Sequence, residues 1–351
     1  MIISRTPFRI SFFGGGTDYP VWFRENGGSV LAATINKHCY ISCRYLPPFF
    51  PHKSRIVYQK VETVASNDQI EHHAVRGTLR YMNIEGGLEL HHDGDLPGRS
   101  GLGSSSSFTV GLLHALFALK RIMPTKNQLA TTDMHVDQEV LRENVGCQDQ
   151  VLAAYGGFLR INFLAGSSDG DFQIAPIIVS RERIQEFQDH LLLYYTGVPR
   201  IASDIAREQL DRTQENRRPL SLIMQMVDEA VRLFTSGAPL TGIGELLHES
   251  WLLKKSLSSK ISTSQIDAIY EEARRAGAVG GKLLGAGGGG FMLLFARPED
   301  QPKVKERLKS LLHVPFRFEN QGSQIVLYDP DPPLEDPTPL RPGQELSLVR
   351  Q

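Results

Sequence analysis

A loop rich in glycine and serine, which leads directly into an apolar segment, constrains this chain more than any other stretch. It reads LPGRSGLGSSSSFTVGLL over residues 96–113, and apolar residues recur every three or four positions from Phe108, which predicts a helix with one buried face. The first N–H groups of a helix lack backbone partners and its dipole is positive there, so an anion can bind. Gly101 and Gly103 let the backbone approach that anion, and Ser104–Ser107 add hydroxyls. The loop therefore predicts a phosphate site, with a flexible turn that caps an ordinary helix as the alternative.

The composition excludes several classes of protein. The chain has 351 residues, enough for two domains, and 41% of them are hydrophobic, as in a globular protein. No apolar run is long enough to span a bilayer, and Arg5 and Pro7 interrupt the segment where a secretory signal needs an apolar core. The formal net charge of −1 argues against nucleic acid. We expect a cytoplasmic protein that binds small molecules and no membrane, and a homodimer is left open. The cysteines are expected to be reduced thiols at Cys39, Cys43 and Cys147.

The rest of the chain predicts an α+β protein. Apolar runs predict strands at 2–13, 39–46, 55–64, 88–92, 157–163, 172–179 and 191–195. Amphipathic spacing predicts helices from Thr125 to about Gly146, around Arg200, and at about 218–235, 240–256 and 264–276. We expect a domain boundary around 180–190, where the charged run 180–183 separates sheet-rich from helix-rich sequence. The end of the chain is expected to form a hairpin over 314–328 that turns at 320–322, followed by a proline-rich tail at 329–351.

Two further glycine-rich segments are distant from the first in the sequence. The first predicted strand ends at GGGTD, residues 14–18, where the glycines leave open space in front of Asp18; a plain turn is the alternative. The other segment, residues 282–295, reads KLLGAGGGGFMLLF and formally contains G-x-G-x-x-G. A dinucleotide fingerprint needs a strand before it and a helix after it, whereas here we expect a helix before and a strand after. Lys282 is followed by leucine, which also excludes a P-loop.

In this order, the three segments resemble the three motifs of the GHMP kinases. The first is RTPFRISFFGGGTDY at residues 5–19, the second begins PGRSGLGSS at residue 97, and the third spans 282–291. The resemblance covers residues 2–328. The galactokinase branch carries Gly-Glu-His-Thr-Asp-Tyr where this chain has GGGTDY, which argues against galactose. With QDQ at 148–150, the chain is most similar to the branch of D-glycero-D-manno-heptose 7-phosphate kinases.

The resemblance implies a fold and an activity. The fold is the two-domain GHMP kinase architecture, with an ATP-binding domain at 1–185 like ribosomal protein S5 domain 2, a ferredoxin-like domain at 186–328, and the tail at 329–351. The activity is transfer of a phosphoryl group from ATP, with Mg²⁺, to the anomeric hydroxyl of a sugar phosphate, giving a heptose 1,7-bisphosphate. The alternatives are another sugar kinase of the family, such as one acting on fucose, and a non-catalytic sugar sensor.

The resemblance also implies which residues bind ATP and its metal. Mg²⁺ would be held by the hydroxyl of Ser105 and by the carboxylate of Asp137, where relatives usually have glutamate, with Glu139 as the fallback. The phosphates of ATP would be bound by Gly101, Leu102, Gly103, Ser104, Ser105 and Ser106.

The remaining implied roles concern the sugar. Asp149 would accept the proton of the attacking hydroxyl, and Arg9 would hold Asp149 ionised, although a structural ion pair is the alternative. Gly16, Thr17 and Asp18 would contact the sugar, since a carboxylate accepts hydrogen bonds from two hydroxyls at once. Candidates for the cations that bind a distal phosphate are Arg200, Lys254, Lys255 and Lys282.

Overall fold

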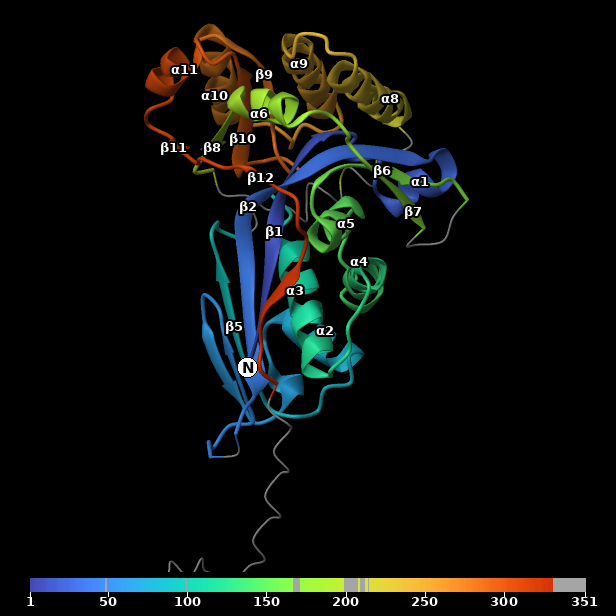
Figure 1. The fold of residues 1–351 in the computed structure, drawn as a ribbon, viewed down its shortest axis with the longest axis vertical. Helices are drawn as coiled ribbons and strands as arrows, with labels where there is room; N and C mark the ends of the chain where they lie inside the picture. Colours follow the sequence, from blue (N-terminus) through green and yellow to red (C-terminus); the bar gives the residue numbers. More distant parts are fainter. Residues whose placement is uncertain are drawn as a thin grey trace, which may run out of the picture.

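The computed structural model describes residues 1–330 except 48, 99, 167–170, 199–207, 209–211 and 214. Within this part, the chain forms a sheet of nine strands and a sheet of four, each with helices packed against it (Figure 1). The α+β class is therefore confirmed. None of the helices in this part is long and apolar enough to cross a membrane. The expected tail beyond residue 330 and the helix expected around Arg200 lie outside the described residues.

Two long antiparallel strands, β1 (Ile2–Phe13) and β2 (Gly28–Tyr45), form the centre of the first sheet. Burial alternates over the first residues of β1, whereas every residue from Thr6 to Phe13 is buried. One face of the sheet is thus open near the N-terminus, and both faces are covered where β1 ends. The other strands are β5 (Leu88–Gly94), β3 (Ser54–Val57), β4 (Val61–Val64), β6 (Phe158–Phe163) and β7 (Phe172–Pro176).

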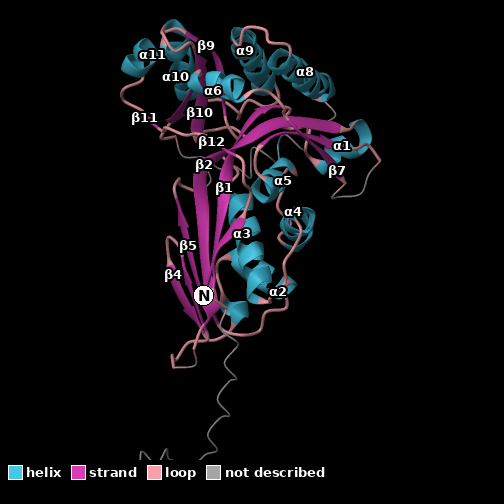
Figure 2. Ribbon diagram, in the orientation of Figure 1, coloured by secondary structure: helices cyan, strands magenta, loops and turns pink. Residues whose placement is uncertain are grey.

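Helices cover one face of this sheet (Figure 2). They are α2 (His73–Tyr81), α3 (Ser104–Leu119), α4 (Lys126–His135) and α5 (Gln148–Tyr155), while α1 (Pro20–Asn26) follows β1. α3 packs on β1 and β2, and it is buried on almost every side, so the expectation of a single buried face was wrong. At Gly111 a Cβ would lie 2.8 Å from Oγ1 of Thr6, so α3 approaches β1 too closely for a larger residue.

The second sheet is antiparallel, in the order β11 (Leu312–His313), β8 (Leu191–Tyr195), β10 (Phe291–Ala296) and β9 (Ala278–Leu283). All six residues of β10 are buried, as expected for a strand that lies between two others and is covered by helices. The helices of this region are α6 (Arg181–Asp189), α8 (Arg217–Thr235), α9 (Thr241–Ser256), α10 (Ser264–Arg275) and α11 (Gln301–Arg307).

The end of the described chain returns to the first sheet. β12 (Phe318–Glu319) pairs with β2, and β13 (Gln324–Tyr328) pairs with β1, so the expected hairpin over 314–328 was wrong. Ser323 lies between these strands and hydrogen-bonds to both Thr6 and His114. The division of the chain at residues 185 and 328 stays a prediction. The strands β12 and β13 come before residue 328 in the sequence, yet they belong to the sheet of β1.

Several other boundaries differ from those expected. Residues 55–64 form a hairpin of two strands rather than one strand, and the strand expected from residue 39 begins at Gly28. The charged run 180–183 begins α6, with Ser180 as its N-cap. α4 ends at His135 and is followed by a π-helical turn, Val136–Val140. A strand, β9, precedes the third glycine segment, and because a strand also follows it, the segment is still no dinucleotide fingerprint.

Candidate active site

An ion pair between Arg9 and Asp149 joins two elements that are distant in the sequence. Arg9 lies on β1, and Asp149 lies in the first turn of α5. The guanidinium binds the carboxylate through two hydrogen bonds, from Nε to Oδ1 at 2.7 Å and from Nη2 to Oδ2 at 2.8 Å. The Arg9 side chain is 7% exposed and the Asp149 side chain 22%, so the carboxylate is sheltered but within reach of a ligand. The two residues predicted to be catalytic thus lie together.

The glycine and serine loop lies against this ion pair. Nη1 of Arg9 donates to the carbonyl oxygen of Gly101 at 2.6 Å, and the backbone N–H of Arg9 donates to the carbonyl oxygen of Leu102 at 3.0 Å. Gly103 has a φ of +75°, and a Cβ there would lie 3.4 Å from Oδ2 of Asp149. The candidate phosphate loop and the candidate base therefore share one site.

The start of α3 is built to face this site. Gly103 is its N-cap, and no side chain caps the helix, so its first N–H donors are not used by a capping side chain. Ser105 is exposed, whereas Ser106 and Ser107 are buried, and Oγ of Ser107 donates to the carbonyl oxygen of Pro7 at 2.9 Å. That contact fixes the helix start on β1 and directs its positive end toward Asp149.

The third glycine segment also reaches the phosphate loop. It joins β9 to β10, and at Gly290, where φ is +100°, a Cβ would lie 2.2 Å from the carbonyl oxygen of Ser100. Oγ1 of Thr196 donates to the carbonyl oxygen of Gly290 at 2.8 Å. The backbone of the segment between β9 and β10 thus lies directly against the loop that begins at Ser100. A side chain at Gly290 would not fit, so glycine is needed at that position.

The turn after β1 places a buried carboxylate beside the ion pair. Asp18 is 1% exposed, its Oδ1 accepts from the N–H of Gly16 at 2.9 Å, and its Oδ2 accepts from Nε2 of Gln148 at 3.0 Å. Burial raises the pKa of Asp18, the N–H of Gly16 lowers it, and the charge of Asp149 raises it further. A Cβ at Gly146 would lie 2.1 Å from Oδ2 of Asp18, so this glycine is required.

The other residues of this turn differ in their access to a ligand. Thr17 is fully buried, and its hydroxyl donates to the carbonyl oxygens of Gly14 and Ser29 and accepts from the N–H of Ser29. Its hydrogen-bonding capacity is used within the turn. Asp18 is almost as buried as Thr17, so Gly16 is the only one of the three predicted sugar contacts that is partly exposed. Sequence reasoning missed Gln148, whose place beside Asp149 in the QDQ triplet was the only signal.

The predicted metal ligand Asp137 lies in the π-helical turn and is 1% exposed. Its Oδ2 accepts from Nε2 of Gln150 at 3.0 Å, whereas Oδ1 has no partner among the described residues. The hydroxyl of Ser106 lies near this carboxyl and lowers its pKa. Burial, and next the charge of Glu143, raise the pKa of Asp137 to about 7. A buried carboxylate oxygen without a partner, beside a serine hydroxyl, is the donor set that Mg²⁺ prefers.

The surroundings of Asp137 differ from the predicted metal site in two ways. The hydroxyl beside Asp137 is that of Ser106, a residue that sequence reasoning assigned to ATP alone, while Ser105 and the fallback Glu139 are exposed. Asp133 is fully buried one turn earlier, and neither of its oxygens has a partner in the described part of the chain. No three acidic, histidine or cysteine residues of the described ranges are grouped as a metal site, so phosphate oxygens and water would complete the coordination.

The candidate cations for a distal phosphate are mostly engaged. Lys254 donates to the carbonyl oxygens of Leu283 and Gly285, and Lys255 forms an ion pair of 3.0 Å with Asp267. Lys282 is 4% exposed and donates to the carbonyl oxygen of Phe12. Arg200 lies outside the described residues, so the partner of a distal phosphate stays a prediction.

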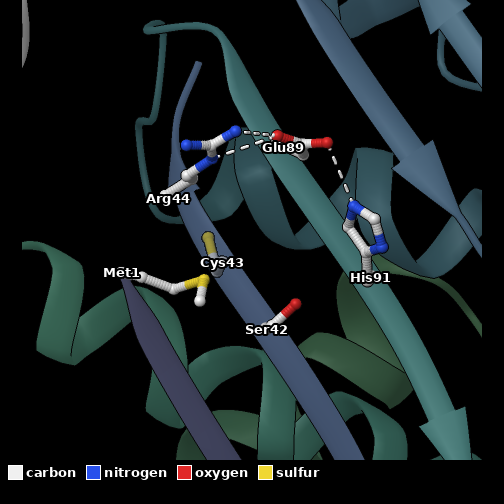
Figure 3. Close-up of a pocket in the computed structure, with 6 residues that line it drawn as sticks. All are labelled: Met1, Ser42, Cys43, Arg44, Glu89 and His91. Atoms are coloured by element: carbon white, nitrogen blue, oxygen red, sulfur yellow. Dashed lines mark hydrogen bonds and ion pairs between the residues drawn. The ribbon is translucent and has the colours of Figure 1, made fainter. Parts of the chain in front are cut away.

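A separate hollow of about 450 Å³ lies on the open face of the first sheet, beside Met1 (Figure 3). Within it, Arg44 binds Glu89 at 2.6 Å and Nε2 of His91 lies 3.1 Å from the same carboxylate. It shares no residue with the site at Arg9 and Asp149, and its charged groups already pair with one another. The hollow therefore belongs to the outer surface of the sheet and not to the candidate active site.

Comparisons with known proteins relate this chain to the GHMP kinases. Residues 70–157 match the family model for the GHMP kinases N terminal domain, and residues 238–314 match that for the GHMP kinases C terminal region. A D-glycero-alpha-D-manno-heptose 7-phosphate kinase of Campylobacter jejuni is 27% identical over 331 residues, which cover 88% of this chain and 93% of the relative. A bifunctional fucokinase/GDP-fucose pyrophosphorylase of Arabidopsis thaliana is 23% identical over 331 residues, covering 86% of this chain but only 30% of that protein.

Solved structures show the same fold. A D-glycero-D-manno-heptose 1-phosphate kinase from Bacteroides thetaiotaomicron superimposes with a TM-score of 0.75 at 23% identity, covering 92% of this chain and 98% of the other. A Streptococcus pneumoniae phosphomevalonate kinase, solved with phosphomevalonate and AMPPNP, gives a TM-score of 0.72 at 16% identity, covering 91% and 100%. The expected two-domain architecture is therefore confirmed.

Proposed function

This chain belongs to the GHMP kinases, and from that premise we propose that it transfers the γ-phosphoryl group of ATP to the anomeric hydroxyl of a sugar phosphate, with D-glycero-D-manno-heptose 7-phosphate as the substrate. The observation that carries the proposal is the two-bonded ion pair of Arg9 and Asp149, which lies against the loop at residues 101–103. Phosphoryl transfer needs chiefly positioning and charge neutralisation, and this pair and loop supply both within one site.

Asp149 acts as the base in this proposal. It accepts the proton of the anomeric hydroxyl, which is more acidic than an ordinary alcohol because the ring oxygen withdraws electron density. Arg9 holds that carboxylate in a fixed orientation through its two hydrogen bonds. Asp18 and Gly16 orient the sugar, and the N–H groups at the start of α3 bind phosphate oxygens.

Asp137, together with the hydroxyl of Ser106 or Ser105, would hold the metal of the nucleotide. Mg²⁺, when bound, would supply neutralisation of the phosphate charge. Asp137 suits this role because its Oδ1 is buried and has no partner among the described residues. Asp137 is shorter than glutamate, and it lies on a π-helical turn, which displaces a residue from regular helical spacing.

The choice of substrate rests on the chain's similarity and on its own motif. The relative from Campylobacter jejuni is named for a heptose 7-phosphate, and GGG at residues 14–16 departs from the galactokinase sequence. A second candidate is a fucose-type sugar, because bifunctional fucokinases of Arabidopsis thaliana and Bacteroides fragilis are 23% and 25% identical to this chain. Both candidates present an anomeric hydroxyl to the same base.

A substrate panel decides between these candidates. Wild-type protein is incubated with ATP, Mg²⁺ and either the heptose 7-phosphate, L-fucose, galactose or mevalonate, and the product is identified by phosphorus NMR. We expect a new phosphate on C1 of the heptose alone. Transfer to fucose instead would replace the substrate and keep the reaction, whereas no transfer to any sugar, with intact sugar binding, would make the chain a sensor.

The role of Asp149 is tested by Asp149→Asn. General base catalysis is typically worth about 100-fold or more, so kcat should fall by at least that factor, while the affinity for ATP stays within about threefold. Asp267→Asn is the matched control, since it also removes a carboxylate that is paired with a cation, on α10. A fully active Asp149→Asn variant would remove this residue from the mechanism.

A further inference from the structure

Two buried polar side chains, Ser11 and Gln148, lie beside the glycine turn at residues 14–16. Ser11 is 6% exposed and Gln148 is 8% exposed, and neither Oγ of Ser11 nor Oε1 of Gln148 has a hydrogen-bond partner among the residues that the structure describes. A buried polar atom without a partner costs free energy, and nearly all such atoms in folded proteins are paired. These two atoms are therefore candidates for contacts with a ligand.

Ser11 lies on the same face of β1 as Arg9. The register of β1 with β2 runs without a break from Arg9 to Ser11, and residues two apart on a strand point to one face of the sheet. On that face Arg9 binds the candidate base Asp149, which lies on α5. The hydroxyl of Ser11 thus points to the side of the sheet that carries the candidate active site, two residues nearer to the glycine turn.

Asp18 determines which end of the Gln148 amide is free. Its carboxylate accepts from the backbone N–H groups of Gly16 and Gln148, and from Nε2 of Gln148 at 3.0 Å. A carboxylate is an acceptor, so the amide nitrogen faces Asp18 and Oε1 is directed away from it. Each oxygen of Asp18 thereby has a partner within the fold, and Oε1 of Gln148 is left as an acceptor.

The place beside Gly15 has room for a ligand atom. Gly15 is partly exposed, and a Cβ there would lie 3.4 Å from Oγ of Ser11 and 3.7 Å from Nε2 of Gln148. Apart from the chain neighbours, no other described residue has an atom within 4 Å of that point. At Gly16 a Cβ would lie 3.3 Å from the side chain of Leu220 on α8. The gap at Gly15 is therefore bounded by two polar side chains and has an apolar side chain next to it.

We propose that Ser11 and Gln148 bind one hydroxyl of the sugar at Gly15: Oε1 of Gln148 accepts its hydrogen, and the hydroxyl of Ser11 donates to its oxygen. The inference rests on the proposed sugar kinase function, and it makes these two residues determinants of specificity. Asp18 then acts on the sugar through Gln148, whose amide it holds in place. A site that pairs with a substrate hydroxyl rejects an analogue without that hydroxyl much more strongly than an apolar pocket rejects a missing methylene.

The first test removes the hydroxyl of Ser11. In Ser11→Ala, KM for the sugar should rise at least about tenfold, with KM for ATP within about twofold, because the substrate hydroxyl loses one of its two partners. The mono-deoxy analogues of the sugar are compared in both proteins, and for one of them Ser11→Ala and wild type should have the same kcat/KM. Thr78→Val is the matched control, because the hydroxyl of Thr78 on α2 is also buried and has no partner in the described part of the chain.

The second test fills the gap. The φ of Gly15 is not in the left-handed region, and a methyl group there would lie at van der Waals distance from Ser11 and Gln148, so Gly15→Ala should fold. It should raise KM for the sugar at least about tenfold, because the methyl group occupies the place of the sugar hydroxyl. Gly242→Ala on α9 is the matched control, since a Cβ there would lie 3.4 Å and 3.6 Å from Leu233. It should leave KM unchanged.

A binding measurement separates this inference from the proposed function. If wild type phosphorylates L-fucose and not the heptose 7-phosphate, the same kinetic comparisons are made on fucose. If wild type phosphorylates no sugar, the proposed function fails, and calorimetric titration of wild type and Ser11→Ala with the heptose 7-phosphate, L-fucose and galactose decides the inference. Binding of one of these sugars that is at least about tenfold weaker in Ser11→Ala would support it.

Four outcomes overturn the inference. They are equal KM and equal sugar binding in wild type and Ser11→Ala, an equal loss for every deoxy analogue, an unchanged KM in folded Gly15→Ala, and no binding of any of the three sugars to wild type. If one of the two variants does not fold, the other decides. Failure of both to fold, while Thr78→Val and Gly242→Ala fold, would make the gap at Gly15 a structural feature and would equally overturn the inference.

Discussion

Arg9 is the residue on which the most contacts of the site depend. Its guanidinium binds both oxygens of Asp149 and the carbonyl oxygen of Gly101, so one side chain fixes the candidate base and the phosphate loop relative to each other. The planar fork of arginine suits this geometry, because it presents several donors in fixed directions. A lysine would keep the charge but could not serve the three acceptors with the same geometry.

We therefore expect Arg9→Lys to lose activity although its charge is conserved. Loss of a two-bonded contact to a charged partner costs about 1.5 to 3 kcal/mol, which corresponds to at least about a tenfold fall in kcat. Steady-state kinetics with the preferred sugar provide the measurement. Arg44→Lys, which alters an arginine and glutamate pair on the open face of the sheet, serves as the control and should leave kcat unchanged. Equal activity of Arg9→Lys and wild type would show that only the positive charge of Arg9 matters, and not the geometry of its guanidinium group.

Asp133 illustrates the opposite case, a buried carboxyl that the fold does not stabilise. Burial, and then the negative charges of Asp137, Glu143 and Asp149, raise its pKa well above 3.8, and neither oxygen has a partner among the described residues. The unfolded chain releases this proton near pH 4 and the folded chain retains it, so the stability of the fold falls as the pH rises above 4.

Asp133→Asn should therefore stabilise the protein at neutral pH. Asparagine has almost the same shape and does not ionise, so a gain of about 1 kcal/mol is expected at pH 8, shrinking as the pH approaches 4. Urea unfolding at pH 8 and at pH 5 measures the difference. A variant that is less stable than wild type at pH 8 would indicate that a cation holds Asp133 ionised in the folded protein.

At the scale of elements, the sequence predicted what is local and missed what depends on a distant partner. The helix after the phosphate loop and the capping box of Thr125 and Gln128 were predicted correctly, because both depend on neighbours within a few residues. The hairpin over 314–328 was wrong, because apolar alternation and turn residues do not specify which strand is the partner. For the same reason, Ser106 and Gln148 were missed as neighbours of Asp137 and Asp18, since their roles depend on where α3 and α5 direct them.

The contact that joins α3 to the returning chain is a set of three hydrogen-bonding side chains. Nδ1 of His114 lies 2.9 Å from Oγ of Ser323, which lies 2.8 Å from Oγ1 of Thr6. Burial lowers the pKa of His114 to about 4. In the unfolded chain, histidine titrates near 6.5, so the fold loses stability as the pH falls from about 6.5 toward 4.

His114→Gln should reduce this loss. Glutamine can still hydrogen-bond to Ser323 but does not titrate. One pKa unit corresponds to about 1.4 kcal/mol, so wild type should lose about 2 to 3 kcal/mol of stability through His114 between pH 7 and pH 4, and the variant should not. Chemical unfolding across that range gives the slope for each protein. The same slope in both would show that His114 is protonated in the folded state, contrary to its buried position.

At the scale of the whole molecule, the chain passes from the first sheet to the second and back again. β12 and β13, which complete the first sheet, follow every strand of the second sheet in the sequence. The backbone N–H of Asp329 donates to the carbonyl oxygen of Met1 at 2.8 Å. Lys282 and Gly290 reach from the second sheet to β1 and to the phosphate loop. The candidate active site therefore depends on both sheets, and its first sheet is not encoded by one continuous segment.

It follows that residues 1–185 alone should not fold cooperatively. β1 would lose the hydrogen bonds of β13 along one edge, Thr6 and His114 would lose Ser323, and an apolar edge strand would be exposed to aggregation. The same residues joined through a flexible linker to residues 315–330 should regain a cooperative urea transition and slow amide exchange in β1. Both chains lack the second sheet, so the comparison isolates the two returning strands. Equal cooperativity without 315–330 would mean that β13 is only an addition to a sheet that is already stable.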